Sequence, residues 1–249
     1  MKVLVVIPAR YESIRFPGKV LASKTGKYLI QHTFERACLA GLPQKVLIAT
    51  DSEKVLDACK RFGAPCVLTS AEHQSGTDRI AEAVAGIDVD VIVNVQGDEP
   101  EIEPQNIDLL AKLLLDNPQA QMATLVADFE NKQQIADPNI VKAIVDKDGY
   151  AIYFSRSVIP FSRTDGGTGP VDNYLRHLGI YAYRKHFLEK ITSLPQTTLE
   201  KIEKLEQLRV VESGYKILTA KVKHTFDGVD TVEQYEEFVR RYNNRIKTS

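Results

Sequence analysis

The sequence has almost no net charge. Its 32 Lys and Arg residues nearly balance 33 Asp and Glu residues, which leaves a formal net charge of −1. A chain with this balance has no overall positive field that would attract nucleic acid or an anionic membrane surface. We therefore expect no nucleic-acid partner and no membrane partner, and any anion-binding site must be local.

Cysteines and long apolar runs are also scarce. Cys38, Cys59 and Cys66 are odd in number and form no CxxC pair, which favours free thiols in a reducing compartment over disulfides or a thiolate metal site. The apolar run at residues 3–7 is too short for a signal-peptide core or a membrane span, and no later run is long enough. These absences predict a cytoplasmic protein.

Short β-branched runs alternate with amphipathic segments over roughly the first hundred residues. The expected strands are 3–7, 45–51, 65–69 and 90–100. The run VLVVI at 3–7 is apolar throughout, as in a parallel strand that is covered on both faces. The order predicts a three-layer α/β fold around a mostly parallel sheet, in which ligands bind beyond the carboxyl ends of the strands.

After about residue 120 the rhythm changes. Strand patterns follow one another with only short polar stretches between them, which indicates a largely antiparallel β region, and residues 163–173 are typical of a flexible loop. A helix is expected from Thr197, in capping-box register with Glu200, to Gly214. A last helix should follow Asp230 and Thr231, with Tyr235, Phe238, Val239 and Tyr242 as its apolar stripe.

The loop after the first strand carries three cations. Arg10, Arg15 and Lys19 lie within the stretch PARYESIRFPGK, at residues 8–19. Such a loop can bind a phosphate through backbone N–H groups and cationic side chains, although exposed loops often carry Arg and Lys for no such reason. It is neither a Walker A loop nor a GxGxxG loop, and the absence of GxGxxG disfavours a nicotinamide-binding domain.

Two carboxylates suggest a metal site. Asp98, in QGDEP, lies at the end of the most apolar strand, where Mg²⁺ could bind together with a substrate phosphate, but a polar turn is the simpler alternative. Glu99 would face the opposite way, so only one of the two neighbours should bind metal directly. Asp230 could supply the second carboxylate, or it could simply cap the helix that follows.

Three further stretches have two interpretations each. Ser75 and Gly76 could let the backbone approach a flat base, or they could form an ordinary turn. The period-two face of His177, Tyr181 and Tyr183 could line a sugar pocket or cover a neighbouring sheet. Glu206 lies at the rim of an apolar stripe and could face inward or be solvated.

Taken together, these stretches resemble the 3-deoxy-manno-octulosonate cytidylyltransferases. The matching blocks, in the order of the family, are PARYESIRFPGK, ATD (49–51), HQSGTDR (73–79), VNVQGDEP (93–100), YFSR (153–156), RHLGIYAYR (176–184), LEQLR (205–209) and GVDT (228–231). The resemblance implies a cytoplasmic homodimer that transfers CMP from CTP to 3-deoxy-manno-octulosonate (KDO) for lipopolysaccharide synthesis. It further implies one nucleotidyltransferase domain, with residues 1–120 mainly nucleotide-binding, 121–227 mainly sugar-binding and dimerising, and 228–249 holding the metal aspartate and the last helix.

The resemblance also implies roles for individual residues. Nucleotide binding is expected at Ala9, Arg10, Arg15, Lys19, Ser75, Gly76 and Gln96. Sugar binding is expected at Gln96, Arg156, Arg163, His177, Tyr181, Glu206 and Gln207. Asp98 and Asp230 should bind Mg²⁺ and act in catalysis together with Lys19, which with Arg15 would stabilise the departing pyrophosphate. The loop 163–173 matches no block of the family, and Val20 replaces a proline that often follows PGK.

Other functions stay open at this point. A cytidylyltransferase for sialic acid or for an amino-substituted KDO would differ by a few polar contacts. A nucleotide-binding regulatory subunit without activity is also conceivable, but it would be expected to have lost the metal carboxylates, and Asp98 and Asp230 are both present.

Overall fold

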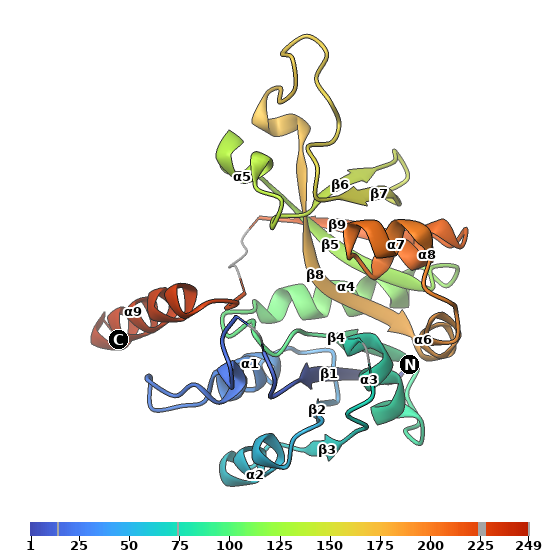
Figure 1. Ribbon diagram of the computed structural model, residues 1–249. Coiled ribbons are helices and arrows are strands. Elements are labelled where there is room, and N and C mark those ends of the chain that lie inside the picture. The colour runs from blue at the N-terminus through green and yellow to red at the C-terminus, as the bar shows by residue number, and fades with distance from the viewer. Residues whose placement is uncertain (14, 74, 224–227, 249) are drawn as a thin grey trace. The chain divides into compact units, whose positions relative to one another are not determined.

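A computed structural model describes residues 1–13, 15–73, 75–223 and 228–248 of the chain (Figure 1). The contacts within it divide the chain into two compact units. Unit 1 comprises residues 1–108 and 226–249, and unit 2 comprises residues 109–225. The sequence-based division into segments 1–120, 121–227 and 228–249 stays a prediction about function, and the two units are described separately below.

Unit 1 contains four parallel strands, in the order β3-β2-β1-β4: β1 (Val3–Ala9), β2 (Lys45–Thr50), β3 (Cys66–Leu68) and β4 (Val91–Asn94). All seven residues of β1 are buried, as the uniformly apolar sequence predicts for a central strand covered on both faces. The strand β2 pairs with residues 4–9 of β1 and β4 with residues 3–6, so that Ile7 lies beside Ile48 and Val6 beside Asn94.

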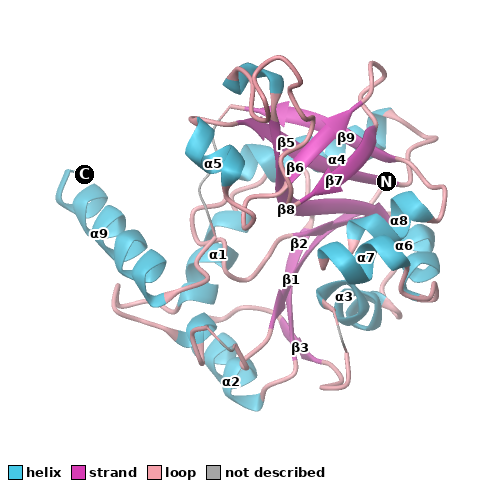
Figure 2. Cartoon of the chain, turned by 45° about the horizontal axis from the view of Figure 1, so that its top comes forward, coloured by secondary structure: helices cyan, strands magenta, loops and turns pink. Residues whose placement is uncertain are grey.

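Helices cover both faces of this sheet. They are α1 (Leu29–Ala37), α2 (Glu53–Phe62) and α3 (Gly76–Val84), and Figure 2 shows α1 and α2 on one side of the strands and α3 on the other. The predicted α/β class with a mostly parallel sheet is thereby confirmed. The helix α2 ends at Gly63, whose φ of 75° is left-handed, a conformation that glycine adopts without steric cost. The helix α4 (Pro104–Asp116) leads the chain into unit 2.

The chain returns to unit 1 with α9 (Val232–Thr248). Tyr235 and Phe238 of α9 form a buried cluster with Leu29 of α1 and with Val229. The apolar stripe of α9 is the one that the sequence predicts, so α9 is fixed by side-chain packing rather than by helix propensity alone.

Unit 2 is built on the strands β5 (Met122–Asp128), β6 (Lys142–Val145), β7 (Ala151–Ser155), β8 (Leu175–Arg184) and β9 (Ile217–Val222). The pairs β5–β8, β6–β7 and β6–β8 are antiparallel, as predicted, whereas β9 runs parallel to β5. The short helices of unit 2 are α5 (Lys132–Ala136), α6 (Lys185–Thr192), α7 (Thr198–Glu203) and α8 (Gln207–Glu212).

One predicted helix is wrong. The pattern from Thr197 to Gly214 predicts a single helix, but the structure has α7 and α8 with Lys204 between them at a left-handed φ of 54°. The capping box of Thr197 and Glu200 is present as predicted. A salt bridge joins the two helices, because Arg209 of α8 contacts the carboxylate of Glu200 at 2.6 Å.

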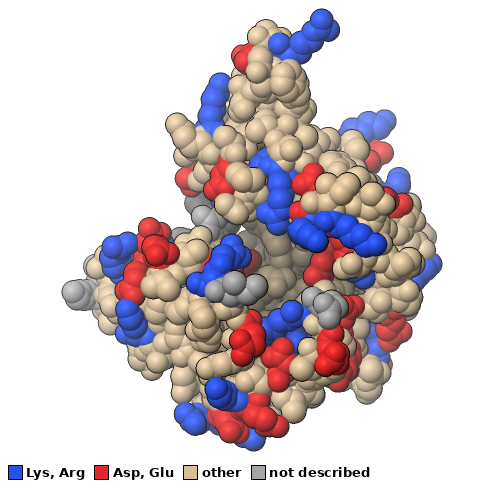
Figure 3. Space-filling view, in the orientation of Figure 1, with Lys and Arg blue, Asp and Glu red and all other residues tan. Residues whose placement is uncertain are grey.

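Charges of both signs are interspersed on the face drawn in Figure 3, in agreement with the balanced composition. Within the described ranges, no helix combines the length and the apolar character needed to cross a bilayer.

Candidate active site

Three segments that are far apart in the sequence meet at Lys19. The 3-10 helix η1 (Lys19–Leu21) follows Gly18, whose φ is 68°. The Nζ of Lys19 lies 2.6 Å from Oδ2 of Asp98 and 2.9 Å from Oδ1 of Asp230, and it donates to the carbonyl oxygen of Val229 at 3.0 Å. The structure therefore brings together the three residues that were predicted to act in catalysis.

Backbone contacts hold the two carboxylates next to each other. The N–H of Val229 donates to the carbonyl oxygen of Asp98 at 2.8 Å, and this bond ties the segment before α9 to the turn after β4. Asp230 follows directly, so its side chain emerges beside that of Asp98. Arg15 adds a second cation, with its NH2 3.0 Å from Oδ2 of Asp230.

The alternative that Asp230 serves as a helix cap is not supported by these contacts. Thr231 Oγ1 accepts a hydrogen bond from the N–H of Gln234 at 3.3 Å, and the side chain of Gln234 accepts from the N–H groups of Asp230 and Thr231. The side chains of Thr231 and Gln234 thus accept hydrogen bonds from the backbone N–H groups at the start of α9, as in a capping box. Both carboxylate oxygens of Asp230 instead face cations.

The electrostatic environment keeps Lys19 charged. Burial lowers the pKa of Lys19, but the charge and hydrogen bond of Asp98, followed by those of Asp230, outweigh it and raise the pKa above its ordinary value. The side chain of Lys19 is 12% exposed, against 28% for Asp98 and 42% for Asp230. At neutral pH Lys19 is therefore a fixed cation and cannot serve as a general base.

Two carboxylates with a cation between them also fit a divalent metal ion. Mg²⁺ commonly binds through one or two carboxylates and completes its shell with substrate phosphates and water. Among the described residues there is no group of three or more His, Cys, Asp or Glu side chains that could hold a metal without substrate. Asp98 and Asp230 thus have the donor chemistry of a site shared with a phosphate, and the ammonium of Lys19 marks a position where positive charge is stable.

Gly97 explains how the turn before Asp98 reaches the first strand. A Cβ atom on Gly97 would lie 2.8 Å from the carbonyl oxygen of Pro8 and 3.2 Å from Cδ1 of Ile30. A Cβ atom essentially never comes within 2.8 Å of a backbone oxygen, so a side chain here would force the turn away from β1. Only glycine allows this close approach.

We expect Gly97→Ala to lower the free energy of unfolding by about 1–3 kcal/mol, the usual cost of forcing an extra group into a packed region. It should also impair activity, because the turn carries Asp98. Chemical denaturation followed by circular dichroism measures the first effect. Gly86→Ala is the matched control, because a Cβ at Gly86 would meet nothing within 4 Å. Equal stability of the two variants would contradict this account of Gly97.

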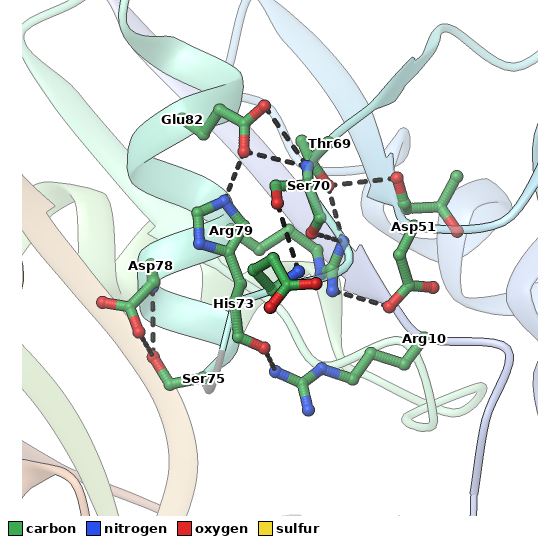
Figure 4. A network of polar contacts seen from close by, with 11 residues as sticks. Arg10, Asp51, Thr69, Ser70, His73, Ser75, Asp78, Arg79 and Glu82 are labelled. Atoms are coloured by element: carbon green, nitrogen blue, oxygen red, sulfur yellow. Dashed lines mark hydrogen bonds and ion pairs between the residues drawn. The ribbon is translucent and has the colours of Figure 1, made fainter.

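A second polar network lies at the ends of β2 and β3 (Figure 4). Arg79 of α3 is fully buried and donates to Oδ2 of Asp51 at 2.7 Å and to Oγ1 of Thr69 at 2.5 Å. Oδ1 of Asp51 accepts from the N–H of Tyr11 at 3.5 Å, so the network reaches the opening loop. Arg10 joins it by donating to the carbonyl oxygen of His73. The sequence-based interpretation named Arg10 but missed Asp51 and Arg79.

The other predicted nucleotide residues lie at the start of α3, at the end of β1 and just after β4. Ser75 caps α3, because its Oγ accepts from the N–H of Asp78 at 3.1 Å and donates to that residue's carboxylate at 2.9 Å. A Cβ on Gly76 would lie 3.4 Å from Pro8, so the start of α3 closely approaches the end of β1, where Ala9 is buried. Gln96 is half-buried and donates to Oδ1 of Asn94 at 3.3 Å.

In unit 2, His177 of β8 is the centre of the predicted sugar-binding residues. Its Nε2 lies 3.0 Å from Oγ1 of Thr124, and its Nδ1 lies 3.5 Å from the side-chain nitrogen of Gln207. Its ring contacts those of Tyr181 and Phe154, with centroids 5.5 and 4.7 Å away. Burial lowers the pKa of His177 to about 3, so it is a neutral hydrogen-bonding group at pH 7.

The remaining predicted sugar residues are more exposed. Arg156 is half-buried and donates to the carbonyl oxygens of Glu203, at 2.8 Å, and Pro138, at 3.0 Å. Arg163 is exposed in the loop 163–173, and Glu206 is exposed at the start of α8, so the inward orientation considered for Glu206 is wrong. The structure thus places His177, Tyr181 and Gln207 together, with Thr124 as a member that sequence reasoning missed.

Comparisons with known proteins agree with this arrangement. Residues 4–217 match the model of a family described as cytidylyltransferase. The 3-deoxy-manno-octulosonate cytidylyltransferase of Solibacter usitatus is 45% identical over 245 residues, which cover 98% of this chain and 96% of the relative. The enzyme of the same name from Francisella tularensis subsp. novicida is also 45% identical, over 96% of this chain and 98% of its own.

Two solved structures are similar. A CMP:2-keto-3-deoxy-manno-octonic acid synthetase complexed with CTP has a TM-score of 0.92 and 39% identity, covering 98% of this chain and 100% of its own. A cytidylyltransferase from Leptospira borgpetersenii has a TM-score of 0.62 and covers 100% of this chain and 94% of its own, but at 20% identity it supports the fold alone.

Proposed function

The chain belongs to the family of 3-deoxy-manno-octulosonate cytidylyltransferases, and we propose on that basis that it transfers CMP from CTP to the anomeric hydroxyl of KDO. In this reaction the hydroxyl oxygen forms a bond to the α-phosphorus of CTP, the bond from that phosphorus to the bridging oxygen breaks, and pyrophosphate leaves. The hydroxyl passes its proton to water. The observation that carries the proposal is the meeting of Lys19, Asp98 and Asp230 at the carboxyl end of the parallel sheet of unit 1.

The opening loop would bind the triphosphate. Arg15 and Lys19 are the cations nearest to the two carboxylates, and their charges would stabilise the negative charge that gathers on the departing pyrophosphate. Arg10 contacts the backbone of His73 close to the start of α3, so Ala9, Ser75 and Gly76 are proposed to lie against the cytosine and its ribose. Arg79 and Asp51 would hold the opening loop and the start of α3 in place for this contact.

Asp98 and Asp230 are proposed to hold Mg²⁺. When bound, Mg²⁺ would supply positive charge beside the α-phosphate and favour loss of the hydroxyl proton. The two carboxylates would fix where that charge sits, and Lys19 would balance them in the absence of metal. Because Lys19 is kept protonated, it cannot accept the hydroxyl proton, which passes to water instead.

Unit 2 would recognise the sugar acid. Neutral His177 and its partners Thr124 and Gln207 offer hydrogen-bonding groups to hydroxyls, and Tyr181 offers an aromatic face. A carboxylate is best paired by the planar guanidinium of an Arg, for which Arg156 and Arg163 are the candidates. Gln96 and Glu206 are proposed to contribute further polar contacts.

We expect pyrophosphate release to require CTP, Mg²⁺ and KDO together. Incubation with each of KDO, an amino-substituted KDO and sialic acid, followed by a coupled pyrophosphate assay, tests this. Turnover with KDO well above that with sialic acid supports the proposal. Absence of pyrophosphate with all three acids would overturn it and favour a regulatory subunit without activity.

The proposal includes a cytoplasmic location and a homodimer formed through unit 2. The exposed apolar side chains of Ile152 and Phe161 in unit 2 support the second part. Sedimentation equilibrium would measure the mass, and a monomer at micromolar concentration would contradict the dimer.

A further inference from the structure

We propose that Glu101, held by Arg241 and Arg245, is a positioning residue that sets the separation of the two metal carboxylates. The side chain of Glu101 is 4% exposed. Its Oε2 accepts from Nε of Arg241 at 2.9 Å and from NH2 at 2.5 Å, while its Oε1 lies 2.8 Å from NH2 of Arg245. The Arg245 contact is an ion pair without the geometry of a hydrogen bond.

Glu101 is connected to Asp98 by backbone hydrogen bonds. The N–H of Glu99 donates to the carbonyl oxygen of Gln96, and the N–H of Ile102 donates to that of Glu99, both at 3.2 Å. These two successive turns make residues 96–102 one short hydrogen-bonded segment, called the QGDEPEI turn below. Glu101 and Asp98 therefore belong to the same segment, and a displacement of one is expected to move the other.

The two arginines are rigidly connected to Asp230. Arg241 and Arg245 are four residues apart, so they lie on one face of α9 in successive turns. The same helix begins two residues after Asp230. The QGDEPEI turn and α9 are thus attached at two points: the backbone bond from Val229 to Asp98, and the ion pairs of Glu101.

The second attachment matters because apolar packing of α9 weakens toward its end. Tyr235 and Phe238 are buried in the cluster with Leu29, but a cavity of about 480 Å³ follows, lined by His32, Tyr242 and Arg245 among others. Tyr242 still packs against the cluster, and the ion pairs of Glu101 with Arg241 and Arg245 add a direct link from this end of α9 to the QGDEPEI turn.

A small tilt of α9 would suffice to disturb the metal site. Without the ion pairs, α9 would pivot on the packed cluster of Tyr235 and Phe238. These residues lie five and eight positions after Asp230, which is about 8–12 Å along a helix axis, so a tilt of about 5° would shift Asp230 by about 0.7–1 Å. Displacements of that size cost about 100-fold in reactions that depend on alignment. Glu101 would act in this way on the metal carboxylates without touching metal or substrate.

The inference rests on the proposed metal site, and its test separates the two. Calorimetric titration of CTP into the full chain, without sugar, at a series of MgCl₂ concentrations gives the Mg²⁺ concentration that half-saturates nucleotide binding. For Glu101→Gln we expect this concentration to rise about tenfold, the effect typical of residues that orient metal ligands. Excess Mg²⁺ should then restore nucleotide binding, whereas kcat should stay lowered by the displaced carboxylates. Arg245→Gln changes an exposed partner of the same ion pair, and it should also raise the half-saturating Mg²⁺ concentration. This variant provides the test if Glu101→Gln folds poorly.

Glu103→Gln is the matched control. Glu103 lies two residues further along and pairs with Arg36 of α1 at 2.8 Å instead of with α9. Its Mg²⁺ requirement should stay within about twofold of the wild type, as for an independent site. If Glu101→Gln and Arg245→Gln melt earlier but keep the wild-type Mg²⁺ requirement, the ion pairs are merely structural and the inference is wrong. If Asp98→Asn, run in parallel, also keeps that requirement, the metal assignment itself fails.

Discussion

Asp98→Ala is expected to lower kcat for CMP transfer about 1000-fold, because it removes one of two carboxylates that would hold the charge beside the α-phosphate. The fold should survive. The bond that ties Val229 to this turn uses the backbone oxygen of Asp98, which the substitution keeps. Lys19 also retains Asp230 as a partner at 2.9 Å. The measurement is the rate of pyrophosphate release at saturating CTP, KDO and Mg²⁺, with circular dichroism as the check on folding.

Glu99→Ala is the sharpest control for this prediction. Glu99 is the neighbouring carboxylate in the same turn, but the Nζ of Lys19 contacts Asp98 and Asp230. We expect Glu99→Ala to keep kcat within about tenfold of the wild type, since its charge lies outside that pair. Near-normal transfer by Asp98→Ala would refute the metal assignment, and equal losses in both variants would mean that the turn, rather than one carboxylate, is needed.

Local patterns were sufficient to predict most of unit 1. The uniformly apolar run at residues 3–7 is typical of a covered strand, and the stripe of α9 marks a helix face in the sequence itself. On β8, the predicted common face of His177, Tyr181 and Tyr183 is confirmed by their ring contacts. It persists although the pairing of β5 with β8 shifts register between Thr124 and Leu125.

The contacts that make the site could not be predicted in this way. Periodicity describes neighbours along the chain, whereas Lys19, Asp98 and Asp230 meet only because β1, β4 and α9 are placed by packing. The family resemblance named these residues, but it did not predict that the Lys19 ammonium contacts both carboxylates. The break between α7 and α8 was missed for a different reason. Lys204 has a left-handed φ, and a lysine in the sequence gives no indication of that conformation.

Lys19→Ala is expected to lower kcat/KM by the equivalent of roughly 2–4 kcal/mol of transition-state stabilisation, the usual loss when one preorganised charge-stabilising donor is removed. Its pKa is raised by Asp98 and Asp230 against the effect of burial, so the wild-type side chain is a cation over the whole neutral range. The loss should therefore be almost the same at pH 6.5 and pH 8.5. A general base would instead give a strong pH dependence in the wild type that the variant lacks.

The variant should also respond to Mg²⁺ in a direction opposite to that of Asp98→Ala. Removing Lys19 leaves two carboxylates facing each other without their shared cation, which favours any cation that replaces it. We expect Lys19→Ala to bind Mg²⁺ at least as tightly as the wild type in the presence of CTP while it turns over slowly. Lys27→Ala, which removes a lysine paired with Glu35 on α1, should change neither property. An unchanged rate for Lys19→Ala would mean that Lys19 is an ordinary loop cation without a role in catalysis. Slow turnover with intact Mg²⁺ binding would mean that Lys19 stabilises charge on the phosphates of CTP.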